Sequence, residues 1–183
     1  MDNITGKHSM IITLDVDALL FDKLRQIVEA DLEVVEINSV DPVILKSVLQ
    51  QFPMLRVGAG NIIDVNQVEA CHQAGVHFLT SPGFSPAIAQ TASLYDITYL
   101  PGVATLSEAM HALSIGCQQV RPLPAQLPFC TLLNKYLPSL KLFPAEVEWE
   151  EIEHFLNLPA VAAVSMINPE KKQLQMISAV AFT

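Results

Sequence analysis

The sequence predicts an α/β fold, a compact (β/α)8 barrel formed by a single domain that spans residues 1–183. Short apolar, β-branched runs of strand length alternate with segments whose apolar residues recur at helical spacing. This strand–helix unit occurs eight times with short connections, which is typical of a parallel sheet covered by helices. Hydrophobic residues make up 51% of the chain and charged residues only 16%, so most elements should be buried on at least one face.

The elements can be assigned in order along the chain. Predicted strands cover Met10–Leu14, Leu32–Ile37, Leu55–Gly60, His77–Ser81, Ile97–Leu100, the start of 118–126, Leu140–Phe143 and Val161–Ile167. Predicted helices cover Ala18–Ala30, 41–49, 64–75, Ser85–Leu94, Thr105–Ile115, Leu127–Leu137, Glu148–Leu158 and a closing segment from Lys171. Asp41 and Asp64 are suited to helix starts, and Gly75 and Gly116 to helix ends. The pairs Pro82-Gly83 and Pro101-Gly102 are suited to turns.

A doubly wound open sheet is the alternative fold. Such a sheet usually carries a glycine-rich phosphate-binding turn after its first strand. Asp15-Val16-Asp17 occupies that place, and the later Gly58-Ala59-Gly60 lacks a third glycine. The barrel is therefore favoured, although 183 residues are few against the ~250 typical of such barrels.

The charge of the chain limits its partners. Its formal net charge is −9, and no cluster of lysine and arginine interrupts the acidic character, so nucleic acid and anionic membranes are not expected as partners. No apolar run approaches the ~18 residues of a membrane span, and no secretion signal is visible. Three cysteines without metal or disulfide spacing fit a reducing compartment, so we expect a cytoplasmic protein.

Six residues at the predicted strand ends mark a candidate site, because the active sites of such barrels lie at the carboxyl ends of the strands. These residues are Glu36, Asn38, Asn61, Pro82, Arg121 and Ser165. A carboxylate, an amide and a guanidinium on one face can hold a small polar acid. Glu36 and Arg121 can equally form an internal ion pair that fills the interior, and the sequence leaves both interpretations open. The histidines show no metal-binding spacing, so neither a metal nor a cofactor is expected.

Four short blocks at the strand ends resemble one enzyme family along nearly the whole chain. They are Val34-Val35-Glu36-Ile37, Val57-Gly58-Ala59-Gly60, Ser81-Pro82-Gly83 and 100–108, which reads LPGVATLSE. Their order and spacing are similar to those of the 2-keto-3-deoxy-6-phosphogluconate (KDPG) and 4-hydroxy-2-oxoglutarate (KHG) aldolases. The resemblance implies a small TIM barrel, a homotrimer, and a metal-free class I lyase reaction that cleaves a 2-keto-4-hydroxy acid to pyruvate and an aldehyde.

The family's chemistry requires an amine. A lysine on the sixth strand forms a Schiff base with the substrate ketone, and a glutamate on the second strand transfers protons. The resemblance places that glutamate at Glu36, but counting without gaps from Pro101-Gly102 places Arg121 where the lysine is expected. An arginine stays protonated at neutral pH and offers no nucleophilic nitrogen.

Other positions depart from the family pattern as well. Val40 stands where the resemblance implies a substrate-binding arginine, and Asn61 stands where it implies a threonine. The phosphate-binding glycines that the resemblance implies after strand seven fall at Glu146 and Val147, and its Gly-Gly-Ser of strand eight falls at Ser165-Met166-Ile167. A carboxylate at a phosphate site should repel the phosphate. Glu36 and Pro82 are the principal residues that match.

Lys141 offers a second possible amine, because Leu140-Lys141-Leu142-Phe143-Pro144-Ala145-Glu146 resembles the lysine motif of the family. Aligning it as strand six would require about twenty inserted residues, so we assign it to strand seven, near the base of the barrel. Three functions remain: a diverged homologue that binds a small keto acid or other carboxylate without Schiff-base activity, which is favoured; an active keto-acid lyase that uses Lys141 or another group; and a non-catalytic oligomeric barrel with a filled interior.

Overall fold

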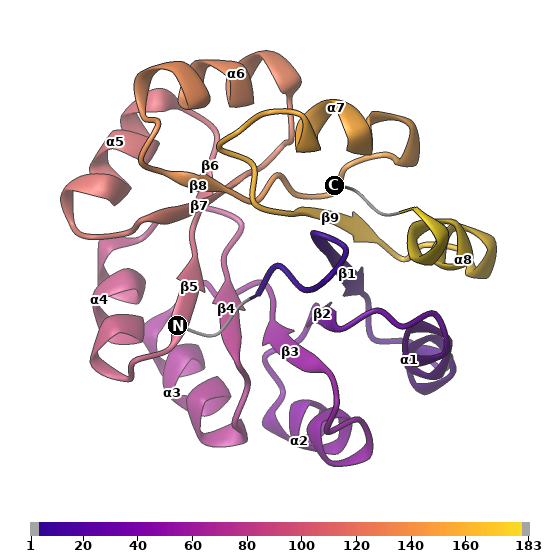
Figure 1. Cartoon of the computed structure of the whole chain (residues 1–183). Coiled ribbons are helices and arrows are strands. Elements are labelled where there is room, and N and C mark those ends of the chain that lie inside the picture. Colours follow the sequence, from indigo (N-terminus) through magenta and orange to yellow (C-terminus); the bar gives the residue numbers. More distant parts are fainter. Residues whose placement is uncertain (1–3, 181–183) are drawn as a thin grey trace.

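The computed structural model describes residues 4–180 and has parallel strands at its centre with helices around them (Figure 1). The strands are β1 (Met10–Leu14), β2 (Val34–Ile37), β3 (Arg56–Ala59), β4 (Phe78–Thr80), β5 (Thr98–Leu100), β6 (Gly102–Val103), β7 (Gln119–Pro122), β8 (Lys141–Leu142) and β9 (Val164–Ile167). The α-helices are α1 (Leu20–Glu29), α2 (Pro42–Gln51), α3 (Val65–Ala74), α4 (Pro86–Leu94), α5 (Leu106–Ser114), α6 (Leu127–Tyr136), α7 (Ile152–Leu156) and α8 (Lys171–Ala179). The alternation of strands and helices predicted from the sequence is confirmed.

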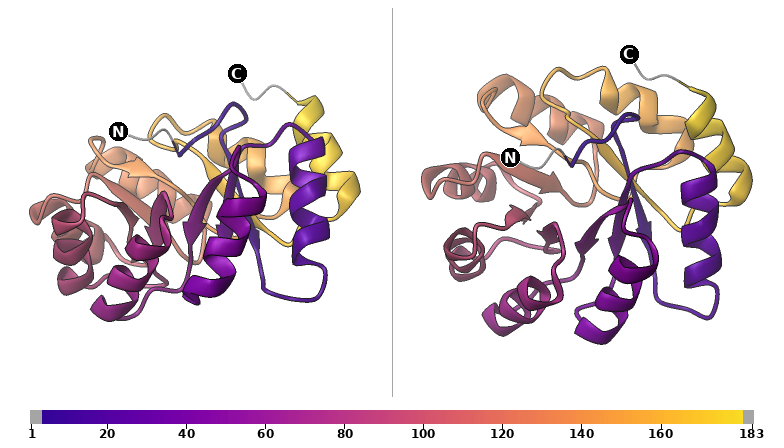
Figure 2. Two further views of the ribbon diagram at one scale, coloured as in Figure 1. Left: turned by 90° about the horizontal axis from the view of Figure 1, so that it is seen from below. Right: turned by 60° about the horizontal axis from the view of Figure 1, so that its bottom comes forward.

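Every strand pair is parallel. Six strands form one sheet in the order β5-β4-β3-β2-β1-β9, and three form another in the order β6-β7-β8. The chain passes from one sheet to the other at Pro101, between β5 and β6. At the opposite edge, Leu142 of β8 exchanges backbone hydrogen bonds with Ala160 and Ala162, just before β9. Figure 2 shows the strands of both sheets inside the ring of helices.

Two details of the predicted elements were wrong. Pro101-Gly102 was expected to form a turn, but Gly102 belongs to β6 and pairs with Arg121. A Cβ on Gly102 would lie 2.3 Å from the carbonyl oxygen of Pro82, so the strand passes this loop only because the residue has no side chain. The acidic helix after strand seven is also shorter than expected, because a 3-10 turn at Trp149–Glu151 precedes α7.

The helix boundaries follow the expected capping residues. The Asp64 carboxylate accepts hydrogen bonds from the backbone N–H groups of Asn66 and Gln67 at the start of α3. Gly75 ends that helix with a φ of +91°, a left-handed conformation that glycine adopts without strain. In the described part of the chain, residues 4–180, no helix is long and apolar enough to cross a membrane.

The side chains of the strands divide between two regions. Those that face the helices form the larger apolar core, which includes Ile12, Val35, Val57, Leu79 and Val120. Those that point to the other face, called the inner face below, contribute Ile11, Val34, Phe78 and Leu100 to a second apolar cluster. Ile4, Phe143 and Ala163, which lie outside the strands, complete this cluster. Successive strand residues point to opposite faces, so the next inner residue after Val34 is Glu36 and the next after Phe78 is Thr80. The inner face therefore changes from apolar to polar toward the carboxyl ends of the strands.

Candidate functional site

Nearly all polar side chains buried in the structure lie at or near the carboxyl ends of the strands. Within the described residues they are Thr13, Glu36, Thr80, Ser81, Arg121 and Ser165. Buried polar groups are costly to desolvate unless they are hydrogen-bonded. Their concentration at one end of an otherwise apolar interior marks this end as the candidate site.

Glu36, Thr80 and Arg121 form a buried hydrogen-bonded triangle, called the polar cluster below. The Nη1 group of Arg121 donates to Oε1 of Glu36 at 3.0 Å and lies 2.8 Å from Oγ1 of Thr80. The Thr80 hydroxyl donates to the same Glu36 oxygen at 3.0 Å. The side chains of Arg121 and Glu36 are 5% and 1% exposed, so the ion pair is shielded from solvent and weakly screened by salt.

Gly60 leaves the room that the Glu36 carboxylate occupies. A Cβ at residue 60 would lie 2.7 Å from Oε1 of Glu36 and 2.7 Å from Oδ1 of Asn38. No real Cβ approaches other atoms so closely, so any larger residue would displace one of the two side chains. The glycine at the end of β3 thus brings the Asn38 amide oxygen close to the polar cluster.

A second polar network borders the cluster at the ends of β1, β2 and β9. The carboxylate of Asp15 accepts hydrogen bonds from the side-chain amides of Asn38 and Asn168, each at 2.8 Å. The Asn168 oxygen in turn accepts from the backbone N–H of Asp15 at 3.1 Å. The hydrogen bonds from Asn38 and Asn168 lower the pKa of Asp15, which therefore stays charged at this rim. The amide nitrogen of Asn38 is committed to Asp15, and its oxygen is turned toward Gly60.

The other predicted site residues lie around this centre with different degrees of exposure. Asn61 and Pro82 are exposed on the loops after β3 and β4. Ser165 is buried in β9 and accepts a hydrogen bond from the backbone N–H of Glu146 at 3.1 Å. Glu146 is itself exposed and has a φ of +57°, a left-handed conformation in which glycine is favoured. A carboxylate therefore occupies a backbone position suited to glycine.

Lys141 lies away from the polar cluster. It is exposed, and its Cα pairs with that of Gln119, two residues before Arg121 toward the amino end of β7. Lys141 thus lies near the base of the strands, as expected from the sequence. None of the lysines is buried, whether Lys7, Lys23, Lys46, Lys135, Lys141, Lys171 or Lys172. The most shielded of them, Lys23, forms an ion pair with Asp17 at 2.7 Å.

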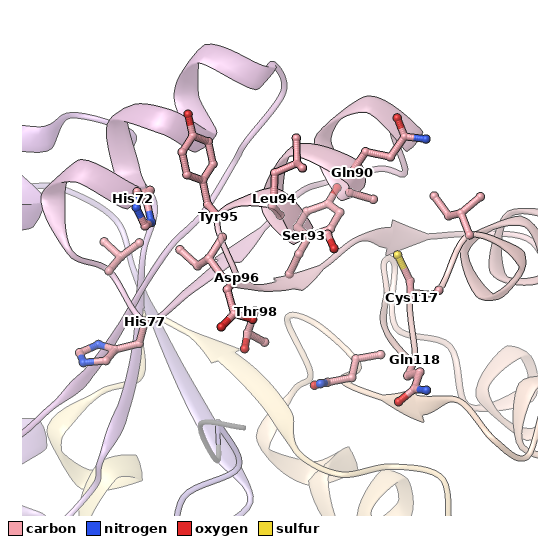
Figure 3. Close-up of a pocket in the computed structure, with 18 of the residues that line it drawn as sticks. His72, His77, Gln90, Ser93, Leu94, Tyr95, Asp96, Thr98, Cys117 and Gln118 are labelled. Atoms are coloured by element: carbon pink, nitrogen blue, oxygen red, sulfur yellow. The ribbon is translucent and has the colours of Figure 1, made fainter.

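A wide surface pocket of about 1290 Å³ lies at the other end of the strands (Figure 3). Its walls come from α4 and from the loops that lead into β4, β5 and β7, and they include His77, Gln90 and Gln118. The His72 ring stacks on Tyr95 at a centroid distance of 4.6 Å. Nδ1 of His77 is occupied as the acceptor of the Val57 backbone N–H. This pocket contains no buried charge, so the chemistry of the polar cluster is separate from it.

No group of three or more His, Cys, Asp or Glu residues suited to a metal ion occurs within residues 4–180. The fold and site together define a parallel α/β protein with a buried carboxylate and guanidinium at the carboxyl ends of its strands. A family model described as KDPG and KHG aldolase matches residues 7–178. The chain belongs to the KDPG and KHG aldolase family.

Curated relatives match over part of their length. A 2-dehydro-3-deoxy-phosphogluconate aldolase of Treponema pallidum is 30% identical over 45% of this chain and 40% of its own. A 2-dehydro-3-deoxy-6-phosphogalactonate aldolase of Escherichia coli is 28% identical over 62% of this chain and 48% of its own. The aligned part thus spans less than half of each of these relatives.

Solved structures show the same fold over nearly the whole chain. A 4-hydroxy-2-oxoglutarate/2-dehydro-3-deoxyphosphogluconate aldolase superimposes with a TM-score of 0.85 at 24% identity, covering 100% of this chain and 98% of its own. A Zymomonas mobilis 2-keto-3-deoxy-6-phosphogluconate aldolase with 3-phosphoglycerate gives 0.86 at 20% identity, covering 98% and 94%. At these identities the likeness establishes the fold alone.

Sequence reasoning missed several participants in the site. Thr80 was not singled out, although a threonine after Phe78-Leu79 in a short buried strand points to the same face as Phe78. Thr13 was not singled out either, although it follows Ile11 and Ile12 in β1 and points to the same face as Ile11. Asn168 could not have been found, because it reaches Asp15 across 153 residues of sequence from a loop.

Proposed function

We propose that this chain binds a small keto acid or other small carboxylate at the carboxyl ends of its strands, without forming a lysine Schiff base. Arg121 carries the proposal, because it occupies the place expected for the family's lysine and forms an ion pair with Glu36. Its guanidinium stays protonated and can bind an anion but cannot attack a ketone.

The distribution of amines supports the absence of Schiff-base chemistry. A catalytic lysine needs a low-dielectric or cationic environment to expose a neutral amine at pH 7. The lysines of this chain are exposed or, at Lys23, paired with a carboxylate. Lys141, the alternative amine for an active lyase, is exposed at the opposite end of the strands from the polar cluster.

The free edge of Arg121 supports binding of a carboxylate. Arg121 has five N–H donors, and within the described residues both of its side-chain hydrogen bonds come from Nη1. Nη2 and Nε are left to donate to a ligand in the paired geometry that suits a carboxylate. Asn61, on the exposed loop after β3, would add an amide at the rim.

The surrounding charges favour a ligand of low negative charge. Glu36 already neutralises Arg121, and Asp15, Asp17 and Glu146 lie on the loops at the carboxyl ends of the strands. Phosphorylated acids carry about two charges more than a simple keto acid and would be repelled. We therefore propose an unphosphorylated monoanion, such as a 2-keto acid, as the ligand class.

The same family context supports three further parts of the proposal. The two sheets are joined by backbone hydrogen bonds on both sides, consistent with a closed (β/α)8 barrel. A homotrimer is the proposed assembly, supported by a structural neighbour, a cage designed by fusing symmetric oligomeric domains. The free cysteines Cys71, Cys117 and Cys130 are consistent with a cytoplasmic location.

The direct Glu36–Arg121 bond also favours a second candidate, a non-catalytic oligomeric barrel whose interior is filled. Isothermal titration with pyruvate separates the two. The proposal expects saturable binding to the wild type, binding of phosphoenolpyruvate at least about tenfold weaker, and no binding to the variant Glu36→Leu/Arg121→Met, which replaces the pair with apolar groups of similar size. An absence of pyruvate binding by the wild type would overturn the proposal in favour of the filled barrel.

A further inference from the structure

The surface pocket at the amino ends of the strands, called the base pocket below, contains polar side chains with unused hydrogen-bonding capacity. Its volume is about 1290 Å³, and it lies at the surface, so a small molecule can enter it directly (Figure 3). Five of the polar side chains that line it form no hydrogen bond with any residue in the range 4–180: Gln90, Ser93, Thr98, Gln118 and Gln119. Their donors and acceptors are therefore available to a ligand.

Two of these side chains belong to the inner face of the strands. Thr98 of β5 pairs with Phe78 of β4, a member of the inner apolar cluster, so the two residues point to the same face. Gln119 precedes Arg121 by two residues on β7 and shares its inner orientation. Thr98 and Gln119 are both half-buried. The base pocket thus reaches from α4 beneath the strands to polar groups at the edge of the apolar interior.

Small residues make the base pocket hollow. Ala89 and Ala92 of α4 line it, together with Gly116 after α5. A Cβ on Gly116 would meet nothing within 4 Å, which agrees with open space at this position. The stacked rings of His72 and Tyr95 line the same pocket and add flat ring surface to it. The pocket therefore offers apolar surface beside its polar groups.

The lining of the base pocket favours an uncharged ligand. It includes no lysine or arginine among the described residues, and Asp96 is its one carboxylate. The net charge of −9 also disfavours an anion. An apolar ligand would leave the amides and hydroxyls without partners. A glutamine amide offers one acceptor and two donors, and a hydroxyl both donates and accepts, so the matching ligand carries several groups that do both. Neighbouring hydroxyl groups have this property.

We propose that the base pocket is a second binding site, which takes a small neutral polyhydroxylated molecule, a monosaccharide or a polyol. The hydroxyl groups of the ligand bond to the amides of Gln90, Gln118 and Gln119 and to the hydroxyls of Ser93 and Thr98. Figure 3 shows Gln90 and Ser93 on α4 and Gln118 on the loop before β7, so the ligand bridges these two walls. The site is separate from the polar cluster and does not depend on keto-acid binding there.

A panel of neutral compounds tests the base pocket in the full chain. Saturation-transfer difference NMR with glucose, galactose, mannose, ribose, glycerol, sorbitol and myo-inositol identifies which members bind, and isothermal titration measures their affinity. We expect saturable binding of at least one member. Gln90→Leu/Gln118→Leu removes two exposed amides and should weaken that binding about ten- to thirtyfold, since one hydrogen bond is worth about a factor of five.

The matched control is Gln51→Leu/Gln175→Leu, which changes two exposed glutamines on α2 and α8 outside the base pocket. This variant should bind the same compound with wild-type affinity. The titration of pyruvate should be the same for Gln90→Leu/Gln118→Leu as for the wild type, so the two sites are tested independently. A failure of pyruvate to bind overturns the proposed function and leaves the base pocket intact.

Three results would overturn the inference. The first is an absence of saturable binding by every member of the panel. The second is an unchanged affinity in Gln90→Leu/Gln118→Leu, because the compound then binds elsewhere on the molecule. The third concerns charge: glucose 6-phosphate should bind more weakly than glucose, and tighter binding of the phosphate ester would contradict a neutral ligand class.

Discussion

Replacement of Arg121 by methionine tests how the buried ion pair contributes to stability. The substitution keeps most of the side-chain volume and removes the charge that faces Glu36 at 3.0 Å. Glu36 is 1% exposed and, among residues 4–180, would retain only the Thr80 hydroxyl as a side-chain partner. Removing one partner of a buried pair costs about 3–5 kcal/mol, because the other charge is left without compensation. That is a large part of the 5–15 kcal/mol by which domains are usually stable.

The matched double variant Glu36→Leu/Arg121→Met removes both charges. Replacing a buried pair by apolar residues of similar size is often neutral or stabilising, so this variant should be close to the wild type or more stable. The interaction energy of the two single substitutions is then at least about 3 kcal/mol, well above the 0.3–0.5 kcal/mol within which independent sites add.

Urea unfolding at pH 7, followed by the fluorescence of Trp149, measures these differences. With a slope of about 2 kcal/mol per molar urea, Arg121→Met should unfold at a midpoint about 1.5–2.5 M lower than the wild type. A loss below about 1 kcal/mol, or a double variant as unstable as the sum of the single ones, would refute this account of the pair.

Three further predictions concern other parts of the structure. Gly60→Ala should lower the unfolding free energy, measured in urea, by about 1–3 kcal/mol, because the added Cβ meets Glu36 and Asn38. Gly83→Ala is the matched control and should have little effect, since its Cβ meets nothing within 4 Å. Equal losses in the two variants would contradict the packing argument. Burial raises the pKa of Cys71 from the ordinary 9.0 to about 11 and that of Cys130 to about 12. The stability that the neutral thiols contribute is therefore complete below pH 9 and is lost as the pH rises toward 12. Urea midpoints that stay constant from pH 8.5 to 11 would disprove this. Arg121→Lys alone should not release pyruvate from 2-keto-3-deoxy-6-phosphogluconate in a coupled assay, because Glu146 still repels the phosphate, and measurable cleavage would contradict that assignment.

The sequence predicted the parallel α/β alternation, and the placing of two charged residues at one end of it, for a physical reason. Parallel strands bring their carboxyl ends to one face, so Glu36 and Arg121 could be placed together although they are 85 residues apart. Whether they would bond to each other depends on the side-chain conformations across the interior, which no local pattern specifies. The split of the fifth strand at Pro101 was also hidden, because a Pro-Gly pair normally indicates a turn.

The hydroxyl groups of the site were harder to recognise than the charges. Thr13 and Thr80 stand in apolar strands where threonine is a common β-branched residue. Only the strand register, with Thr13 opposite Glu36 and Thr80 bonded to it, shows that both belong to the polar layer. The amide pair that holds Asp15 depends on Asn168 at the end of β9, far away in sequence.

Trapping with pyruvate and borohydride tests the central claim most directly. A Legionella pneumophila KDPG aldolase has been captured with pyruvate as a covalent carbinolamine intermediate, so it serves as the positive control. The account predicts that intact mass spectrometry finds an adduct on that control and none on this chain under the same conditions. A mass gain on this chain that maps to Lys141 or any other lysine would contradict it.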